Sequence, residues 1–308
     1  MTSMEDKQLY SKRVIREIMD NHGLHFKKSL GQNFLTDKNI LDGIVDAAAI
    51  DKNSAVIEIG PGIGTLTQQL AKHAGKVIAV ELDQRFIPVL TDNFRHLNHV
   101  SVIHGDALEI DFSKLISEQI FSNSNTQIVD NETAIKRIHV VANLPYYVTT
   151  PIIMRLLEER LNLFNIVVMI QKEVAERIQA IPGTKDYGAL SIAAQYYAKP
   201  EIVSVVPRTV FIPEPNVDSA VIRLSLLEKP VVQVDKEEVF FKAIKAGFAN
   251  RRKTLWNNFK AFDQRLSQDE MRAIFAAALV DEKRRGETLT IEEYARLGNE
   301  INRNLLNK

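Results

Sequence analysis

The chain has 308 residues, and its 39 basic and 39 acidic side chains give a formal net charge of zero. An apolar fraction of 45% and a charged fraction of 25% are typical of a soluble globular protein, and the length favours one large domain and a smaller one. The absence of cysteine excludes disulfides, thiolate metal sites and cysteine nucleophiles, and the histidines show no ligand spacing. No apolar run approaches the roughly 20 residues that span a bilayer, and no signal segment is visible. We therefore expect a cytoplasmic protein that binds neither a metal nor a membrane.

Zero net charge argues at first against a nucleic-acid partner, because phosphate neutralisation by basic residues supplies much of the affinity for nucleic acids. The distribution of charge matters more than the sum. Basic residues gather in two places without acids between them, and an overall neutral protein with a basic face is compatible with RNA. The candidate RNA-binding residues are Lys27 and Lys28 in one place and Arg251, Arg252 and Lys253 in the other.

Strands and helices are expected to alternate over the first 180 residues. This alternation predicts an α/β fold with a mostly parallel sheet that helices cover on both faces. The residues from 122 to 134 are polar and rich in Ser and Asn, and we expect an exposed loop there. In chain order, the expected elements are helices 11–21 and 39–48, strand 55–59, helix 65–73, strand 76–82, helix 84–94, strand 100–104, helix 113–121, strand 138–142, helix 150–160, strand 166–170 and helix 171–180.

The pattern changes after residue 200. Two strand-like runs, 202–207 and 220–227, flank a loop with several prolines and are expected to form an antiparallel hairpin that closes the sheet. Past Pro230 the pattern is helical throughout. We therefore predict two domains, residues 1–232 and a small all-helical C-terminal domain, residues 233–308. The helices of the second domain are expected at 237–249, 251–259, 268–278 and 291–304.

A glycine-rich turn, Glu58-Ile-Gly-Pro-Gly-Ile-Gly-Thr, follows the strand at 55–59 and opens the next helix. Glycines let a backbone approach a ligand closely, and a helix N-terminus offers unpaired amides to an anion. Gly60 and Gly62 are the candidate ligand contacts. A tight turn without a ligand remains an alternative. A nicotinamide dinucleotide site is a second one, although the third glycine falls one residue early for it.

Two acids sharpen this interpretation. Glu81 ends the second strand, where a carboxylate can accept both hydroxyls of a ribose, and Asp106 follows the third strand, where it can accept an adenine amino hydrogen. Each acid alone is typical of a solvated strand end. Together with the glycine turn they outline an adenosine site, and a nicotinamide enzyme would share Glu81.

The sequence Asn143-Leu-Pro-Tyr146 ends the fourth strand and carries the proposed chemistry. The exocyclic amine of adenine is a poor nucleophile because its lone pair is delocalised into the ring. Acceptors against its hydrogens, the Asn143 side-chain oxygen and the Leu144 carbonyl, would favour the reactive form, and Pro145 would fix the turn. Tyr146 offers a ring on which an extracted base can stack. A turn followed by a core tyrosine is the alternative.

A second ring would sandwich the base, and Phe211 in the loop Phe211-Ile-Pro-Glu-Pro-Asn is the candidate, although single phenylalanines are usually core residues.

Taken together, these residues resemble the ribosomal RNA adenine dimethyltransferases of the KsgA type. The resemblance covers the chain from about residue 20 to its C-terminal end. It rests on Lys28-Ser-Leu-Gly-Gln-Asn-Phe-Leu35, the glycine turn, Asn143-Leu-Pro-Tyr146, Phe211-x-Pro-x-Pro, Val217-Asp-Ser-Ala220 and Asn250-Arg-Arg-Lys-Thr-Leu255. Asn216 departs from the pattern, where the family commonly has lysine, and the polar stretch 122–134 is longer than usual.

The resemblance implies a Rossmann-like sheet that binds S-adenosylmethionine and a small helical C-terminal domain that binds RNA. It implies transfer of two methyl groups to N6 of each of two adjacent adenosines near the 3′ end of 16S rRNA, by a monomer acting on the small subunit or its precursor during ribosome biogenesis. The cofactor contacts map onto Asn33, Leu35, Gly60, Glu81, Asp106 and Asn143, and the stacking rings onto Tyr146 and Phe211.

Three alternatives remain open. A large-subunit rRNA methylase of the antibiotic-resistance type shares the catalytic motifs, but the C-terminal half favours the small-subunit type. A DNA adenine methyltransferase uses a similar turn, typically with two prolines rather than Leu-Pro. A ribosome-assembly factor would use the same surfaces mainly for binding, with catalysis secondary.

Overall fold

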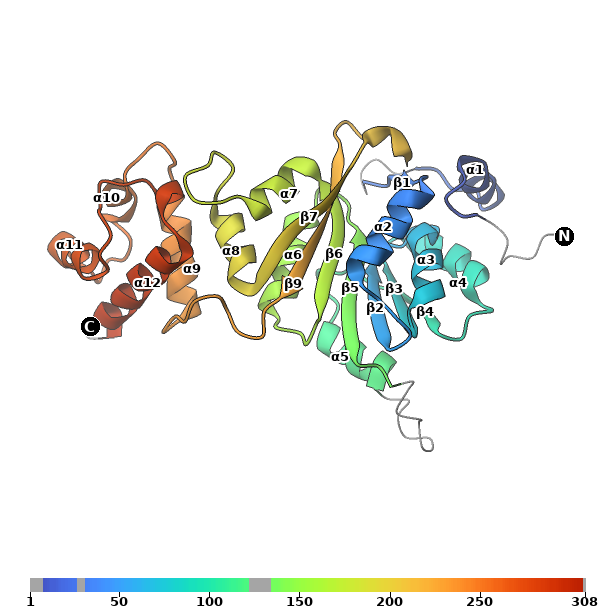
Figure 1. Cartoon of the computed structure of the whole chain (residues 1–308), viewed down its shortest axis with the longest axis horizontal. Coiled ribbons are helices and arrows are strands. Elements are labelled where there is room, and N and C mark those ends of the chain that lie inside the picture. Colours follow the sequence, from blue (N-terminus) through green and yellow to red (C-terminus); the bar gives the residue numbers. More distant parts are fainter. Residues whose placement is uncertain (1–7, 27–30, 122–133, 307–308) are drawn as a thin grey trace. The chain divides into compact units, whose positions relative to one another are not determined.

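The computed structural model describes residues 8–26, 31–121 and 134–306 (Figure 1). A seven-stranded sheet lies at its centre, in the order β4-β3-β2-β5-β6-β9-β7. The expected α/β fold with a helical C-terminal region is confirmed. The strands are β1 (Phe34–Leu35), β2 (Ser54–Ile59), β3 (Lys76–Glu81), β4 (Val100–His104), β5 (Arg137–Asn143), β6 (Asn165–Gln171), β7 (Ala198–Val206), β8 (Phe211–Ile212) and β9 (Ser219–Leu226).

Most helices lie close to the expected ranges, but the one expected at 251–259 begins only at Leu255. Short turns of helix lie at η3 (Gln84–Phe86), η4 (Ser117–Phe121), η6 (Arg208–Val210) and η7 (Gly286–Thr288). The longer ones are α1 (Lys12–Asn21), α2 (Lys38–Ala48), α3 (Thr65–His73), α4 (Ile87–Phe94), α5 (Phe112–Ile116), α6 (Thr149–Glu158), α7 (Lys172–Gln179), α8 (Ala189–Tyr197), α9 (Glu237–Gly247), α10 (Leu255–Phe259), α11 (Gln268–Ala277) and α12 (Ile291–Leu306).

The order of the strands creates the crevice that holds the site. From β2 the chain builds β3 and β4 on one side, and it then crosses to β5 and β6 on the other, with all five strands parallel. Ligands of open α/β sheets bind outside the carboxyl ends of the strands at such a point of reversal. Both neighbours of β2 therefore contribute loops to one crevice.

Buried aliphatic side chains explain why β2, β5 and β6 lie in the middle of the sheet. All six residues of β2 are buried, and β6 is buried except at its last residue. Strands of a parallel sheet that helices cover on both faces carry such continuous apolar runs. Helix α1 buries Val14, Ile15 and Ile18 in a separate hydrophobic cluster that also contains Phe34.

The strands expected at 202–207 and 220–227 are β7 and β9, which are neighbours at one edge of the sheet, and β9 pairs antiparallel with β6 on its other side. Three local features differ from the sequence-based expectations. The connection between β7 and β9 carries β8, which pairs with β1 in a small sheet of its own. Helix α8 was not expected. The helix expected at 113–121 is α5 followed by a π-helical turn, and residues 122–133 lie outside the described part of the chain.

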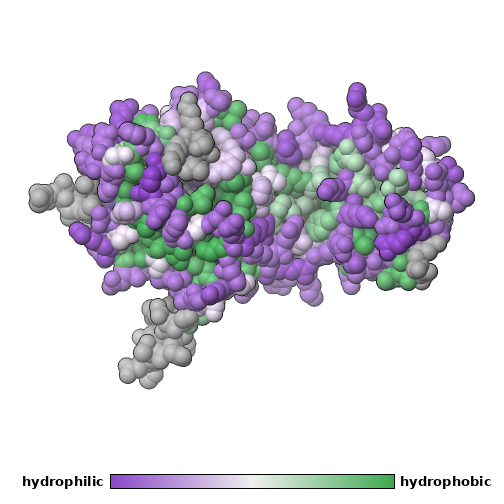
Figure 2. All heavy atoms as spheres, turned by 180° about the vertical axis from the view of Figure 1, so that it is seen from behind, coloured by the Kyte–Doolittle hydropathy of each residue, from purple (hydrophilic) through white to green (hydrophobic). Residues whose placement is uncertain are grey.

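The chain divides into two compact units, residues 1–175 with 201–226 and residues 176–200 with 227–308. The second unit thus takes 176–200 in addition to the helical C-terminal region. In this unit α9 packs against α12, and the rings of Tyr196 and Phe240 lie 5.0 Å apart between centroids. Hydrophilic side chains dominate the visible surface of this unit in Figure 2, as expected of helices that bury one face only.

Candidate active site

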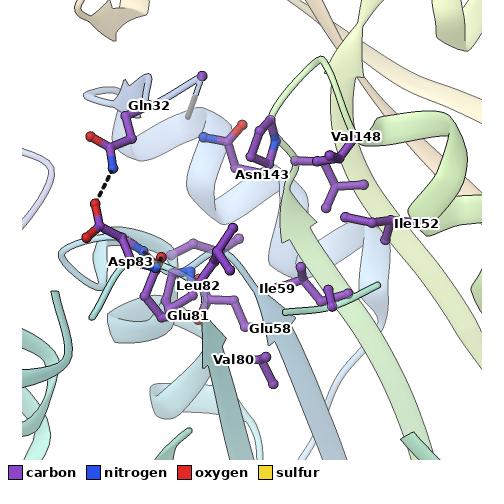
Figure 3. Close-up of a pocket in the computed structure, with 18 of the residues that line it drawn as sticks. Gln32, Glu58, Ile59, Val80, Glu81, Leu82, Asp83, Asn143, Val148 and Ile152 are labelled. Carbon is purple, nitrogen blue, oxygen red and sulfur yellow. Dashed lines mark hydrogen bonds between the residues drawn. The ribbon is translucent and has the colours of Figure 1, made fainter. Parts of the chain in front are cut away.

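A pocket with a volume of about 280 Å³ opens at the carboxyl ends of β2, β3 and β5. Its walls are the glycine turn after β2, the acids after β3 and β4, the turn after β5, and the segment Gly31–Leu35 (Figure 3). Ten of the residues expected from the sequence line this one pocket, although they come from five separate stretches of chain. They are Asn33, Leu35, Gly60, Gly62, Glu81, Asp106, Asn143, Leu144, Pro145 and Tyr146.

The glycine turn has the backbone that the sequence pattern requires. Gly60 and Gly62 have φ angles of +69° and +61°, in the left-handed region that disfavours side chains. A Cβ added to Gly60 would meet no atom within 4 Å, so it would stand in the open space of the pocket. One added to Gly62 would lie 2.6 Å from the ring of Phe34. The turn therefore presents bare backbone to a ligand at Gly60.

Glu81 is held in place by main-chain amides. Its carboxylate accepts hydrogen bonds from the Gly62 amide at 2.9 Å and the Asp83 amide at 2.7 Å. Burial nevertheless raises the pKa of Glu81, because desolvation disfavours the charged form. At the neighbouring strand end, one oxygen of Asp106 accepts the Leu108 amide at 2.8 Å. Asp106 lines the pocket.

Asn143 at the end of β5 is oriented by the segment across from it. Its side-chain nitrogen donates a hydrogen bond to the Asn33 carbonyl at 3.0 Å. The side-chain oxygen is thereby left as the acceptor for a ligand. The following residue, Leu144, is only 1% exposed and donates its amide to the Met169 carbonyl at 3.1 Å. These contacts fix the turn that Pro145 begins.

Two tyrosines follow this turn in different surroundings. Tyr146 is half-buried, and its hydroxyl lies 2.7 Å from the Ser219 hydroxyl, which fixes the ring in the wall of the pocket. Burial raises the pKa of the Tyr146 phenol. Tyr147 also lines the pocket, and it is 54% exposed. The pocket wall therefore contains one ring that a hydrogen bond holds, Tyr146, and one ring that is exposed to solvent, Tyr147.

Phe211 lies elsewhere than the sequence analysis placed it. It is not among the residues that line the pocket, and only 3% of it is exposed. In β8 it pairs with Leu35 and packs in the hydrophobic core with Leu41. The physical reason is the pairing of β1 with β8, which turns this ring into the interior. Its stacking role stays a prediction that this conformation does not display.

Three of the candidate RNA-binding residues lie in the second unit, and the other two lie outside the part of the chain that the structure describes. Lys27 and Lys28 fall outside the described residues. Arg251 donates to the carbonyls of Lys185 and Tyr187 at 2.5 and 2.9 Å, so it braces a loop of its own unit. Arg252 and Lys253 are exposed at the surface.

Glu58 is a residue of the pocket whose role the sequence did not reveal, although it begins the glycine turn. It is 1% exposed, and among the described residues its Oε2 atom has no hydrogen-bond partner. Burial raises its pKa to about 8, and repulsion from Glu81 adds to the rise. At pH 7 burial therefore favours the protonated form of Glu58, against hydrogen bonds from Thr67 that lower its pKa. Its position directly before the glycines was the available signal.

Gln32 and Asp83 were also missed. The side-chain nitrogen of Gln32 donates to Asp83 at 3.0 Å across the pocket (Figure 3). Gln32 belongs to the stretch Lys28–Leu35 on which the family resemblance rests, and Asp83 lies two residues after Glu81, but neither signal indicated the bond between them. Of the residues that the structure describes, no group of three or more His, Cys, Asp or Glu could hold a metal ion. Among them, too, no helix has the length and apolar character to cross a membrane.

Known proteins with similar sequences carry consistent names. A ribosomal RNA small subunit methyltransferase A from Bacillus pumilus is 53% identical, over 94% of this chain and 96% of that protein. One from Clostridioides difficile is 48% identical over 98% and 99%.

Solved structures agree on the fold. A dimethyladenosine transferase from Plasmodium falciparum superposes with a TM-score of 0.72 at 26% identity, covering 88% of this chain and 98% of that one. The 23S rRNA methyltransferase ErmE superposes with a TM-score of 0.60 at 22% identity, covering 87% and 99%, a likeness of fold alone. The family model for ribosomal RNA adenine dimethylase matches residues 23–297. The chain belongs to the ribosomal RNA adenine dimethylase family.

Proposed function

We propose that this chain transfers methyl groups from S-adenosylmethionine to N6 of two adjacent adenosines near the 3′ end of 16S rRNA, giving N6,N6-dimethyladenosine. The observation that carries the proposal is the orientation of Asn143. Its amide nitrogen is engaged by the Asn33 carbonyl, so its oxygen faces a ligand as an acceptor. An adenine amine presents hydrogens to be accepted, and the neighbouring acids and glycines suit a second, adenosine-bearing ligand.

The pocket fits S-adenosylmethionine by the chemistry of its walls. Gly60 leaves open space where a side chain would stand, and Glu81 ends β3 where a ribose can be held. Asp106 would accept the amino group of the cofactor's adenine. We assign the remaining cofactor contacts to Asn33, Leu35, Gly62 and Asn143, which line the same pocket.

Bound S-adenosylmethionine would supply a methyl group already activated on a sulfonium, which would pass to the adenine N6 as the carbon–sulfur bond breaks and S-adenosylhomocysteine leaves. The protein's task is then mainly to position the amine. Asn143 and the Leu144 carbonyl accept the N6 hydrogens and favour the form whose lone pair is available. Tyr146, held by Ser219, gives the extracted base a rigid face to stack on. The N6 proton passes to water after the attack.

The two regions of the chain would divide the work. We assign catalysis to residues 1–232 and RNA or ribosome binding to the helical domain at residues 233–308. The proposed phosphate contacts are Arg251, Arg252 and Lys253 in the helical domain, and Lys27 and Lys28 in the catalytic one. Exposed basic side chains such as Arg252 suit phosphate neutralisation. The names of the relatives at about 50% identity favour the small subunit over the large one.

The test is an incubation of the purified protein with labelled S-adenosylmethionine and unmethylated small ribosomal subunits, followed by nucleoside analysis. The expected product is N6,N6-dimethyladenosine in 16S rRNA, and an Asn143→Ala variant should give none. Label that appears only in large-subunit RNA would indicate a large-subunit methylase instead. If no RNA is labelled while the cofactor still binds, the assembly-factor alternative would be favoured.

A further inference from the structure

The segment Gly31–Leu35, which we call the strap, runs along one side of the pocket, and all five of its residues line it. Both of its ends are packed. A Cβ added to Gly31 would lie 3.2 Å from Pro145, and Phe34 and Leu35 form β1, which pairs with β8. Between these ends, two consecutive residues of the strap reach opposite walls of the pocket.

The first of these contacts is between Gln32 and Asp83. The Gln32 side-chain nitrogen donates to Asp83 Oδ2 at 3.0 Å (Figure 3). Asp83 is 7% exposed and is itself held by Arg85, whose side chain donates to both of its oxygens. The bond from Arg85 lowers the pKa of Asp83 to about 2, so Asp83 is an anionic acceptor throughout the neutral range. A hydrogen bond to a charged group is among the stronger ones in proteins.

The second contact is between the Asn33 carbonyl and Asn143, at 3.0 Å. Asn143 is the last residue of β5, and Asp83 comes two residues after the end of β3. The strap therefore bridges the two strands that flank β2. Any shift of Gln32 away from Asp83 displaces the neighbouring Asn33 carbonyl, which sets the orientation of the Asn143 amide.

We propose that Gln32 is a positioning residue for methyl transfer: its bond to Asp83 holds the strap so that the Asn33 carbonyl keeps the Asn143 oxygen turned toward the adenine amine. The inference rests on the proposed function for the identity of that amine. It also concerns the cofactor directly, because Asn33 and Leu35 are proposed cofactor contacts on the same strap. Loss of the bond therefore slows transfer and weakens cofactor binding, while the packed ends of the strap preserve the fold.

The test is a charge swap. Gln32→Glu places two carboxylates together and should lower kcat and weaken S-adenosylmethionine binding about 10-fold to 100-fold, the range for a hydrogen bond to a charged group. Asp83→Asn alone should cost less, because its amide oxygen still accepts from Gln32. The double variant Gln32→Glu, Asp83→Asn removes the repulsion between the two carboxylates and leaves Arg85, which donates to the Asp83 Oδ2 atom that Gln32 contacts, to pair with the new carboxylate; it should recover to within about threefold of the Asp83→Asn value.

Gln84→Glu is the matched control, because Gln84 is exposed and adjoins Asp83. It adds the same negative charge near the pocket and should leave kcat and binding unchanged. S-adenosylmethionine carries a net positive charge, so a purely electrostatic effect of Gln32→Glu would tighten binding, opposite to the expected result. The melting temperature, recorded for each variant, should change little.

Two readouts separate this inference from the proposed function. If the wild-type protein binds S-adenosylmethionine but methylates no small-subunit RNA, the proposed function fails, and the binding constants of the four variants still test the bond. If Gln32→Glu matches Gln84→Glu, or if the double variant is no better than Gln32→Glu alone, the positioning role is overturned. A wild-type chain that binds no S-adenosylmethionine would overturn both.

Discussion

Each compact unit contains an acid that is at least partly shielded from solvent, and these two acids differ in their hydrogen bonds. In the first, Glu58 lies under the pocket at 1% exposure, and among the described residues its Oε2 atom has no hydrogen-bond partner. In the second, Glu293 at the start of α12 accepts a bidentate pair of hydrogen bonds from Arg284 and another from the Thr290 amide at 2.9 Å. Burial raises the pKa of Glu58 to about 8, whereas at Glu293 burial is opposed by the hydrogen bonds from Arg284 and Thr290 and by the charges of Arg284 and Arg296, which together lower the pKa.

This difference indicates what each unit is built for. In the second unit Glu293 and Tyr294 are paired internally, Tyr294 by donating to the Gly286 carbonyl at 3.0 Å, and Arg252 and Lys253 lie at the surface. The first unit keeps polar atoms open inside a concave site, at a cost in stability that a ligand can offset. We infer that chemistry belongs to the first unit and charge-based binding to the second.

The sharpest test of this division is Asn143→Ala. Removal of one preorganised group that stabilises a transition state costs about 10²–10³ in kcat, and we expect at least that loss here. The dissociation constant for small-subunit RNA, measured by filter binding or sedimentation, should stay within about twofold of the wild-type value if the second unit supplies most of the RNA contacts. Near-normal turnover in this variant would contradict the assignment of Asn143.

Tyr146→Ala tests the base side of the pocket. Stacking of a base on an aromatic ring is worth about 1–3 kcal/mol, so productive capture of the target adenosine should weaken accordingly, seen as a raised KM for RNA. The dissociation constant of S-adenosylmethionine should change much less. Tyr146→Phe is the control, because it keeps the ring and loses only the bond to Ser219. Equal losses in both titrations would argue that the ring shapes the whole pocket instead.

Glu58→Gln tests the contrast between the two acids. The folded state holds the Glu58 proton up to about pH 8, whereas an ordinary glutamate releases it near 4.5, so the native state binds more protons between these values. The free energy of unfolding of the wild type should therefore fall as pH rises through this window, by up to about 1.4 kcal/mol per unit. Glutamine has no proton to release. Relative to wild type, the variant should gain about 2 kcal/mol between pH 5.5 and 7.5.

Urea unfolding of both proteins at the two pH values measures this gain, with exposed Glu109→Gln as the matched control. A difference that does not depend on pH would mean that Glu58 is already charged in the folded protein. Glu293→Gln should show the opposite trend to Glu58→Gln: the lowered pKa of Glu293 contributes stability above its ordinary value that is lost as the pH falls.

The parts of the site that could be predicted from the sequence are those set by short stretches of chain. A strand, a glycine turn and a helix specify where Gly60 lies, and the order of strands brings Glu81 and Asn143 to the same edge of the sheet. The strands and most helices followed from apolar periodicity in the same way. These predictions needed no knowledge of which distant residues touch.

What could not be predicted depends on contacts between distant stretches. The β1–β8 pair joins Leu35 to Phe211 over only two residues each, too short for a periodic signal, and this pairing buries the ring expected in the pocket. The bond between Gln32 and Asp83 likewise joins two loops. Glu58 follows an apolar pattern that predicts its burial, but its missing partner is visible only when the surrounding side chains are placed.

The smallest expected effect concerns the second unit. Arg252 and Lys253 are both exposed, so reversing their charges should leave the fold intact, whereas Arg251 braces the loop at Lys185 and is a poor test residue. If each contacts one phosphate, the slope of log K against log salt for RNA binding should become shallower by about 0.7–0.9 per residue. The activity of the pocket toward saturating RNA should change little.

The double variant Lys229→Glu, Lys260→Glu, at two other exposed positions of the same unit, is the matched control for net charge. Binding is measured with small-subunit RNA over a series of salt concentrations for the wild type, the double reversal and this control. An equal change of slope in the control would mean that only the overall charge matters. An unchanged slope in the double reversal would mean that Arg252 and Lys253 are solvated side chains that contact no phosphate. The RNA-binding residues would then be expected in the unit that carries the pocket.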